Sequence, residues 1–133
     1  MDCFLFEVSG KQMGIAARYV YRIVDDATPA PVPLLPPCHM GIVYYRGDLF
    51  DVIDAGQLLG GQDSRPCEKS PYVILLKWGR RKLGLLPERI VGIRPITDPD
   101  GADTVFTQDG QAIRLITPEE IWQRLSELSY GHG

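Results

Sequence analysis

Proline and glycine constrain the fold of this chain more than any other residues. The 133 residues include eleven prolines and fourteen glycines, so a residue that interrupts regular structure occurs about once in every five positions. This spacing leaves little room for long helices and favours short strands joined by tight turns. The length corresponds to a single domain that can bury a core without disulfides or metals. We therefore expect one mainly β domain over residues 1–133.

Short apolar runs bounded by turn residues predict about five strands in each half of the chain. In the first half we expect strands at 3–8, 12–17, 21–24 (after a helical turn), 41–45 and 49–54. In the second half we expect strands at 72–78, 82–86, 90–96, 104–107 and 111–116. Five prolines in 28–37 predict a stiff connector, and the polar segment 61–71 predicts the boundary between two lobes.

Two helices are predicted, at 55–59 and 117–128. The first is short and stops at Gly60-Gly61. The second has Thr117 as a plausible N-cap and Glu120 three residues later, as in a capping box. Its apolar residues recur at helical spacing and should pack on the sheets: Ile121, Trp122, Leu125 and Leu128. The expected architecture is a first lobe at about 3–60 together with helix 117–128, and a second lobe at about 72–116.

Charge and hydropathy narrow the classes of function. Fourteen basic and seventeen acidic residues give a net charge of −3 and a pI near 5.3, which argues against nucleic acid as a partner. The chain has no apolar run of the length that a bilayer span needs, about 18–20 residues, and its first residues do not resemble a signal peptide. Cys3, Cys38 and Cys67 follow no disulfide or metal-binding spacing. We expect a cytoplasmic protein without direct membrane insertion.

The sequence has no constellation that predicts catalysis. Its two histidines, His39 and His132, have no nucleophile placed for activation, and the adjacent Cys38-His39 pair lacks a second ligand pair at zinc spacing. The basic run 80–82 is interpreted as a solvated hairpin turn, and Glu119-Glu120 as helix-start carboxylates. We expect no enzyme activity, no metal and no cofactor. An interaction module is the more natural reading.

One ordered set of motifs carries a family resemblance. The set is Pro31-Val32-Pro33, Pro36-Pro37, Gly41-Ile42-Val43, Arg46-Gly47, Val52-Ile53-Asp54 and Gly60. It resembles the signature of CheW-like domains, the adaptor family of bacterial chemosensory arrays. Residues 4–8, 13–15 and 84–92 resemble flanking parts of that family, so the resemblance covers roughly residues 3–128.

The resemblance implies two intertwined five-stranded β-barrels with a groove between them. In that groove the helical cytoplasmic tip of a chemoreceptor would dock, and the regulatory domain of a CheA-type histidine kinase would contact the first lobe. Gly41 matches a glycine on this kinase-facing lobe, although a strand-start glycine is an equally good interpretation. The implied function is a non-enzymatic adaptor that couples receptor to kinase, monomeric in isolation and part of arrays in the cell.

The implied receptor-binding residues are Val20, Arg22, Tyr45 and Arg46, whereas Ile23 is expected in the core. The family commonly has an acidic residue at the position of Arg22 and Asn-Leu before the arginine matched by Arg46. We therefore expect a partner with an acidic edge, or a local acid between the two arginines, for which Asp48 is the candidate.

A different class of function stays open at this point. The chain could be a regulatory domain that binds a small molecule in a pocket between the lobes, lined by Tyr44, Tyr45 and Trp78.

Overall fold

The structure is a computed structural model that describes residues 2–25, 39–59, 72–96, 105–108 and 110–130. The first half contains β1 (Asp2–Val8), β2 (Lys11–Ala16), the 3₁₀ helix η1 (Ala17–Tyr19), β3 (Val20–Asp25), β4 (His39–Tyr45), β5 (Asp48–Asp54) and α1 (Ala55–Leu59). The second half contains β6 (Tyr72–Trp78), β7 (Arg81–Leu86), β8 (Arg89–Pro95), β9 (Val105–Gln108), β10 (Gln111–Leu115) and α2 (Pro118–Tyr130). Every predicted strand and helix is present, with small shifts at the ends. The predictions for 28–37, Cys38, Gly60-Gly61, 61–71 and His132 lie outside the described residues.

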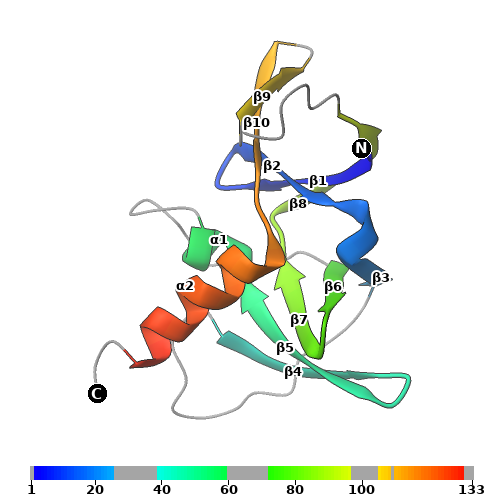
Figure 1. Cartoon of the computed structure of the whole chain (residues 1–133), viewed down its shortest axis with the longest axis vertical. Helices are drawn as coiled ribbons and strands as arrows, with labels where there is room; N and C mark the ends of the chain where they lie inside the picture. The colour runs from blue at the N-terminus through cyan, green and yellow to red at the C-terminus, as the bar shows by residue number, and fades with distance from the viewer. Residues whose placement is uncertain (1, 26–38, 60–71, 97–104, 109, 131–133) are drawn as a thin grey trace.

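The strands form two five-stranded sheets. Sheet A has the order β8-β1-β2-β10-β9, and sheet B has the order β3-β6-β7-β5-β4. Figure 1 shows β1, β2, β9 and β10 of sheet A above β4, β5 and β7 of sheet B. The prediction of a mainly β chain with two five-stranded subdomains and a C-terminal helix is confirmed.

The predicted assignment of one lobe to 3–60 and the other to 72–116 is wrong, because each sheet takes strands from both halves of the chain. β3 follows β2 of sheet A but pairs with β6 of sheet B, and β8 follows β7 of sheet B but pairs with β1 of sheet A. Apolar alternation predicts which face of a strand is buried, but it does not identify the neighbouring strand. The two sheets are therefore intertwined: sheet A combines β1 and β2 with β8, β9 and β10, and sheet B combines β6 and β7 with β3, β4 and β5.

Both sheets repeat one plan. In each, an antiparallel hairpin (β1–β2 or β6–β7) is extended by a parallel strand, β10 beside β2 and β5 beside β7. Gly14 and Gly84 hold matching places in the two hairpins, 70 residues apart (84 minus 14). A Cβ at Gly14 would lie 2.9 Å from both Leu5 Cδ2 and Leu115 Cδ2, and one at Gly84 would lie 3.1 Å from Val52 Cγ2. Glycine at these positions lets three strands pack side by side.

Strands β1 and β6 are buried on both faces, which explains why their sequences are nearly continuous apolar runs. Phe4 and Phe6 of β1 join the cluster where the two sheets and both helices meet, together with Ile74 of β6. Cys3 and Leu5, on the other face of β1, pack inside sheet A. A third cluster, centred on Phe50 and Val52, fills sheet B. The surface that joins the two sheets is thus a packed apolar core.

A bulge interrupts β3 and β8 at matching positions. The register of β3 against β6 shifts between Val20 and Arg22, which leaves Tyr21 as the additional residue. The register of β8 against β1 shifts at Val91, 70 residues further along (91 minus 21). β3 is also an edge strand, and after its bulge Ile23 is 36% exposed whereas Val24 packs against the core of sheet B. The prediction that Ile23 belongs to the core is therefore wrong.

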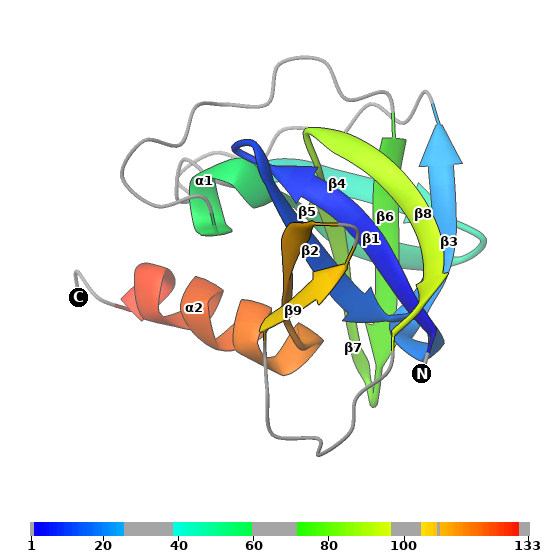
Figure 2. The same ribbon diagram turned by 90° about the horizontal axis from the view of Figure 1, so that it is seen from above.

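The two helices pack next to each other on one side of the sheets (Figures 1 and 2). The predicted cap of α2 is confirmed, because the Glu120 backbone N–H donates to Thr117 Oγ1 over 3.1 Å. Ile121 is fully buried in the cluster between the sheets, and Trp122 and Leu125 pack against it. At the start of α1 the buried Asp54 carboxylate accepts the Gly56 backbone N–H over 2.9 Å. Among the described residues, no helix is long and apolar enough to cross a bilayer.

Candidate functional site

The β4–β5 turn is the local structure that positions Arg46. Tyr45 pairs with Asp48, so Arg46 and Gly47 form a two-residue loop, with φ values of 50° and 88°. Positive φ at both central residues is the geometry of a type I′ turn, whose twist matches that of the flanking strands. A turn thus joins the strands predicted at 41–45 and 49–54, and it places Arg46 at the exposed tip of the hairpin.

Beside this turn lies an aromatic–basic cluster at one end of sheet B. We define it as Tyr21, Tyr45, Arg46, Asp48, Lys77 and Lys82.

The tyrosine rings of the aromatic–basic cluster are backed by the core and hold two of its cations. The Tyr21 ring stacks on the fully buried Phe50 and meets Tyr45 edge to face, with centroids 6.1 Å apart in both pairs. Lys77 Nζ lies 4.3 Å from the centroid of the Tyr21 ring, and Arg46 Cζ lies 5.4 Å from that of Tyr45. These are cation–π distances, so each cation is attracted to a ring that is itself fixed by packing.

Asp48 joins two hairpins through both of its oxygens. Its Oδ1 accepts from Lys82 Nζ over 2.7 Å and its Oδ2 from Lys77 Nζ over 3.0 Å. The hydrogen bond from Lys82, followed by that from Lys77, lowers the pKa of Asp48 below its ordinary 3.8. One ionised carboxylate is therefore shared by two ammonium groups at neutral pH.

The basic run 80–82 is more than a solvated turn. Lys82 binds Asp48, and Arg81 binds Glu119 on α2. The original interpretation was wrong for these two residues because their acceptors, Asp48 and Glu119, lie more than thirty positions away in the sequence.

The structure separates the predicted receptor-binding residues. Tyr45 and Arg46 are in the aromatic–basic cluster, and Arg22 adjoins it as the neighbour of Tyr21. Val20 is half-buried against the core between the sheets. Arg22 is exposed and forms no ion pair with any described residue. Asp48 binds Lys77 and Lys82, and among the described residues it forms no ion pair with Arg22 or Arg46.

Gly41 has a structural explanation in β4. Its φ of 135° lies in a region that favours glycine, and it adjoins a bulge at which the register of β4 against β5 shifts. Its backbone is also buried. The geometry accounts for glycine at this position, and a contact with a kinase stays a prediction.

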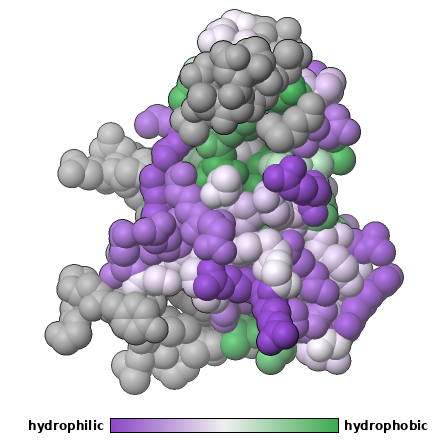
Figure 3. Space-filling model, viewed as in Figure 1, coloured by the Kyte–Doolittle hydropathy of each residue, from purple (hydrophilic) through white to green (hydrophobic). Residues whose placement is uncertain are grey.

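An exposed apolar pair lies on the outer face of the same hairpin. Tyr44 and Leu49 are cross-strand partners and are 70% and 59% exposed. Figure 3 shows a small hydrophobic patch at the lower edge of a largely hydrophilic face, where the β4–β5 hairpin lies. Apolar side chains left in solvent as a pair are typical of a surface that meets another protein.

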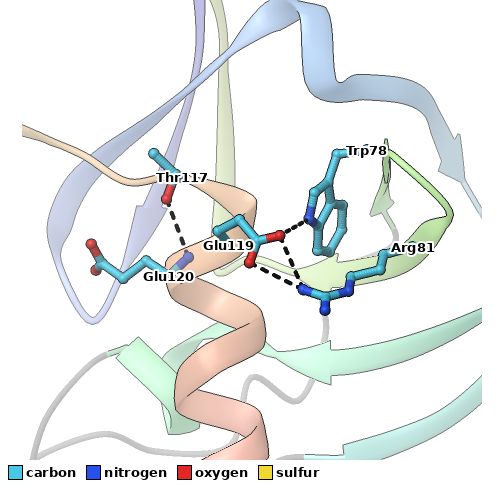
Figure 4. A network of polar contacts seen from close by, with 5 residues as sticks. All are labelled: Trp78, Arg81, Thr117, Glu119 and Glu120. Carbon is cyan, nitrogen blue, oxygen red and sulfur yellow. Dashed lines mark hydrogen bonds and ion pairs between the residues drawn. The ribbon is translucent and has the colours of Figure 1, made fainter.

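A second cluster, which the sequence did not predict, fastens α2 to sheet B (Figure 4). Glu119 accepts from Trp78 Nε1 over 3.1 Å and from Arg81 Nη1 through both carboxylate oxygens over 3.0 Å. Arg81 Cζ lies 4.9 Å from the centroid of the Trp122 ring, which in turn meets Trp78 edge to face at 6.0 Å. The spacing of these residues along the chain carries no signal for this network.

This arrangement argues against the alternative of a small-molecule pocket between the lobes. Trp78 is engaged with α2, Tyr45 packs on the core of sheet B, and Tyr44 faces solvent on the opposite side of β4. The three aromatic residues thus lie in three different environments. Within the part of the chain that the structure describes, no group of three or more His, Cys, Asp or Glu residues could hold a metal ion.

Comparisons with known proteins agree with the geometry. A comparison with curated proteins finds no match. Among solved structures, the crystal structure of the scaffolding protein TtCheW from Thermoanaerobacter tengcongensis matches with a TM-score of 0.73 and 22% identity, over 86% of this chain and 87% of that one. The family model of the CheW-like domain matches residues 2–125. With two intertwined five-stranded sheets and a match over nearly its whole length, the chain belongs to the CheW-like domain family.

Proposed function

We infer that this protein is a non-enzymatic chemotaxis adaptor that couples chemoreceptors to a CheA-type histidine kinase in the cytoplasm. The observation that carries this proposal is the CheW-like domain match over residues 2–125. The similar fold of TtCheW, which is described as a scaffolding protein, supports it. The described residues offer exposed aromatic, apolar and basic surfaces, which are properties of an interaction module.

The receptor tip would bind through Val20, Arg22, Tyr45 and Arg46. Tyr45 and Arg46 are supported by their place in the aromatic–basic cluster, since tyrosine and arginine are enriched at the centres of protein interfaces. Arg22 is supported by its exposure beside the cluster. Val20 would contribute through its exposed part only, because the rest packs on the core.

The kinase regulatory domain would meet the β4–β5 hairpin, on the lobe that carries Gly41. The exposed pair Tyr44 and Leu49 supports this assignment, because both side chains project from the hairpin and have no apolar cover among the described residues. An isolated chain would be monomeric and would assemble with its partners only in arrays, where many weak contacts act together.

Reconstitution tests the proposal. The chain would be combined with a receptor cytoplasmic fragment and the kinase encoded near its gene, and kinase autophosphorylation would be measured with and without each component. We expect receptor control of the kinase only when all three are present. Leu49→Asp should weaken binding of the kinase regulatory domain while leaving receptor binding unchanged, and Val105→Asp, at an exposed position of sheet A, is the matched control. Absence of binding to both partners would contradict the proposed function.

A further inference from the structure

Positive charge is concentrated at one end of sheet B in a chain whose net charge is −3. The aromatic–basic cluster contains three cations (Arg46, Lys77 and Lys82) and one carboxylate (Asp48), so its net charge is 3 minus 1, or +2. Arg22, next to Tyr21, adds a further positive charge that no described residue pairs. This surface therefore has the opposite sign to the molecule as a whole.

The cations are held in place before any partner arrives. Lys77 and Lys82 share the two oxygens of Asp48, and their side chains are 37% and 35% exposed. The Tyr21 ring below Lys77 is fixed by its stacking on the buried Phe50. Ordering a lysine side chain costs conformational entropy. Because these side chains are already ordered in the folded chain, a partner would bind without that loss of entropy.

The positive charge of this cluster also exceeds the negative charge paired with it. A single carboxylate cannot neutralise two lysines, and Arg46 contacts only an aromatic ring among the described residues. Carboxylates brought by a partner would satisfy these donors and would be fixed by charge-assisted hydrogen bonds. The flanking tyrosines would supply the apolar contact that such an interface needs.

We propose that the aromatic–basic cluster, together with Arg22, binds a carboxylate-bearing helical segment of a partner protein. This inference rests on the proposed adaptor function and specifies the charge of the receptor edge that this chain recognises. A protein segment fits better than a nucleic acid, because a long polyanion would meet the net negative charge of the rest of the molecule.

The test uses two synthetic helical peptides with the same apolar face, one flanked by glutamates and the other by lysines. Binding to the full chain would be measured by titration calorimetry, and the contact surface would be mapped by NMR shifts. We expect binding of the glutamate peptide only, with shifts at Tyr21, Tyr45 and Lys77 and an affinity that falls as salt is added.

Charge reversal supplies the decisive comparison. Arg22→Glu should weaken binding of the glutamate peptide by about tenfold or more. Arg94→Glu makes the same charge change at an exposed position of β8 in sheet A and should leave binding unchanged. Melting temperatures of both variants should match that of the unaltered chain, because neither arginine has a described partner.

The outcomes separate this inference from the function on which it rests. Equal binding of both peptides, equal effects of the two substitutions, or binding of a short DNA duplex in place of the glutamate peptide would overturn it. A receptor fragment that binds Arg22→Glu as tightly as the unaltered chain would also overturn it and leave the adaptor function intact. Binding of the glutamate peptide by a chain that binds neither receptor nor kinase would support the acidic-segment specificity and contradict the adaptor function.

Discussion

At the scale of single residues, the two hairpin glycines are the most constrained positions of the sheets. Gly14→Ala would place a Cβ 2.9 Å from two leucine methyl groups, and Gly84→Ala would place one 3.0 Å from Val73 Cγ1. We expect each substitution to lower the free energy of unfolding by about 1–3 kcal/mol, as overpacking does. Urea denaturation measures the change, and Thr107→Ala on the exposed face of β9 is the control. Unchanged stability of both glycine variants would show that the neighbouring strands can move apart to accept a Cβ without lowering the free energy of unfolding.

A pH dependence follows from Asp48. Its pKa is lowered in the folded chain, so its interaction with Lys77 and Lys82 stabilises the fold above the ordinary pKa of 3.8 and is lost as the pH falls through the lower folded value. Asp48→Asn should therefore melt at a lower temperature than the unaltered chain at pH 7, with a gap that closes below pH 3.8. Melting curves from pH 7 to pH 2 measure that gap. A gap that is constant over this range would mean that the two ion pairs contribute nothing to stability.

Single residues also show where sequence reasoning succeeds and where it fails. The position of Arg46 was predictable, because a polar turn between two apolar runs sets the register of a hairpin. The exposure of Ile23 was not predictable, because the bulge at Tyr21, two residues earlier in β3, leaves no mark in the alternation of side chains. The shared partner of Lys77 and Lys82, Asp48, could not be predicted either, because these ion pairs join segments that are distant in the sequence.

At the scale of elements, α2 is held at its N-terminal end by Glu119. Glu119→Ala would remove the acceptor of Trp78 Nε1 and Arg81, and we expect it to lower the free energy of unfolding by about 0.5–1 kcal/mol, because this carboxylate is largely exposed. The chain has only two tryptophans, and both are at this contact, so intrinsic fluorescence reports directly on it. Glu127→Ala, further along the helix and exposed, should change neither stability nor fluorescence. Identical fluorescence of the Glu119 variant and the unaltered chain would contradict this role for Glu119.

The helix itself was predictable from local signals, whereas its contacts were not. The cap at Thr117 and the apolar spacing from Ile121 to Leu125 determine where α2 begins and which face is buried. These contacts are tertiary and involve both sheets. Arg114 of β10 in sheet A binds Glu120, and the β6–β7 hairpin of sheet B binds Glu119.

At the scale of the whole molecule, each half depends on the other, because β3, β4 and β5 join the sheet of β6 and β7, and β8, β9 and β10 join the sheet of β1 and β2. A fragment of residues 1–59 lacks β6, the partner of β3, and a fragment of residues 72–133 lacks β1, the partner of β8. We expect neither fragment to fold alone and an equimolar mixture to regain the native spectrum, because each would supply the strand that the other lacks. Two-dimensional NMR of the fragments, separate and mixed, gives the readout. A dispersed spectrum from either fragment alone would show that the halves are independent.

The sequence predicted the number of strands and the two-part plan, because each strand carries its own apolar pattern and each turn its own residue chemistry. The intertwining was implied only by the family resemblance and not by the strand patterns, because a pattern such as that of β3 is satisfied equally well beside β2 or beside β6. The pairing depends on the core to which both sheets contribute, and that core takes residues from both halves of the chain.

The link between β2 and β3 has a mechanical consequence. Only the three residues of η1 separate a strand in the middle of sheet A from the strand that carries Tyr21 at the edge of sheet B. A partner that pulled on the Tyr21 end of β3 would put tension directly on the backbone of β2. In the same way, β8 at the edge of sheet A follows β7 in the middle of sheet B. A force applied to β3 at the edge of sheet B, or to β8 at the edge of sheet A, is thus transmitted to both sheets.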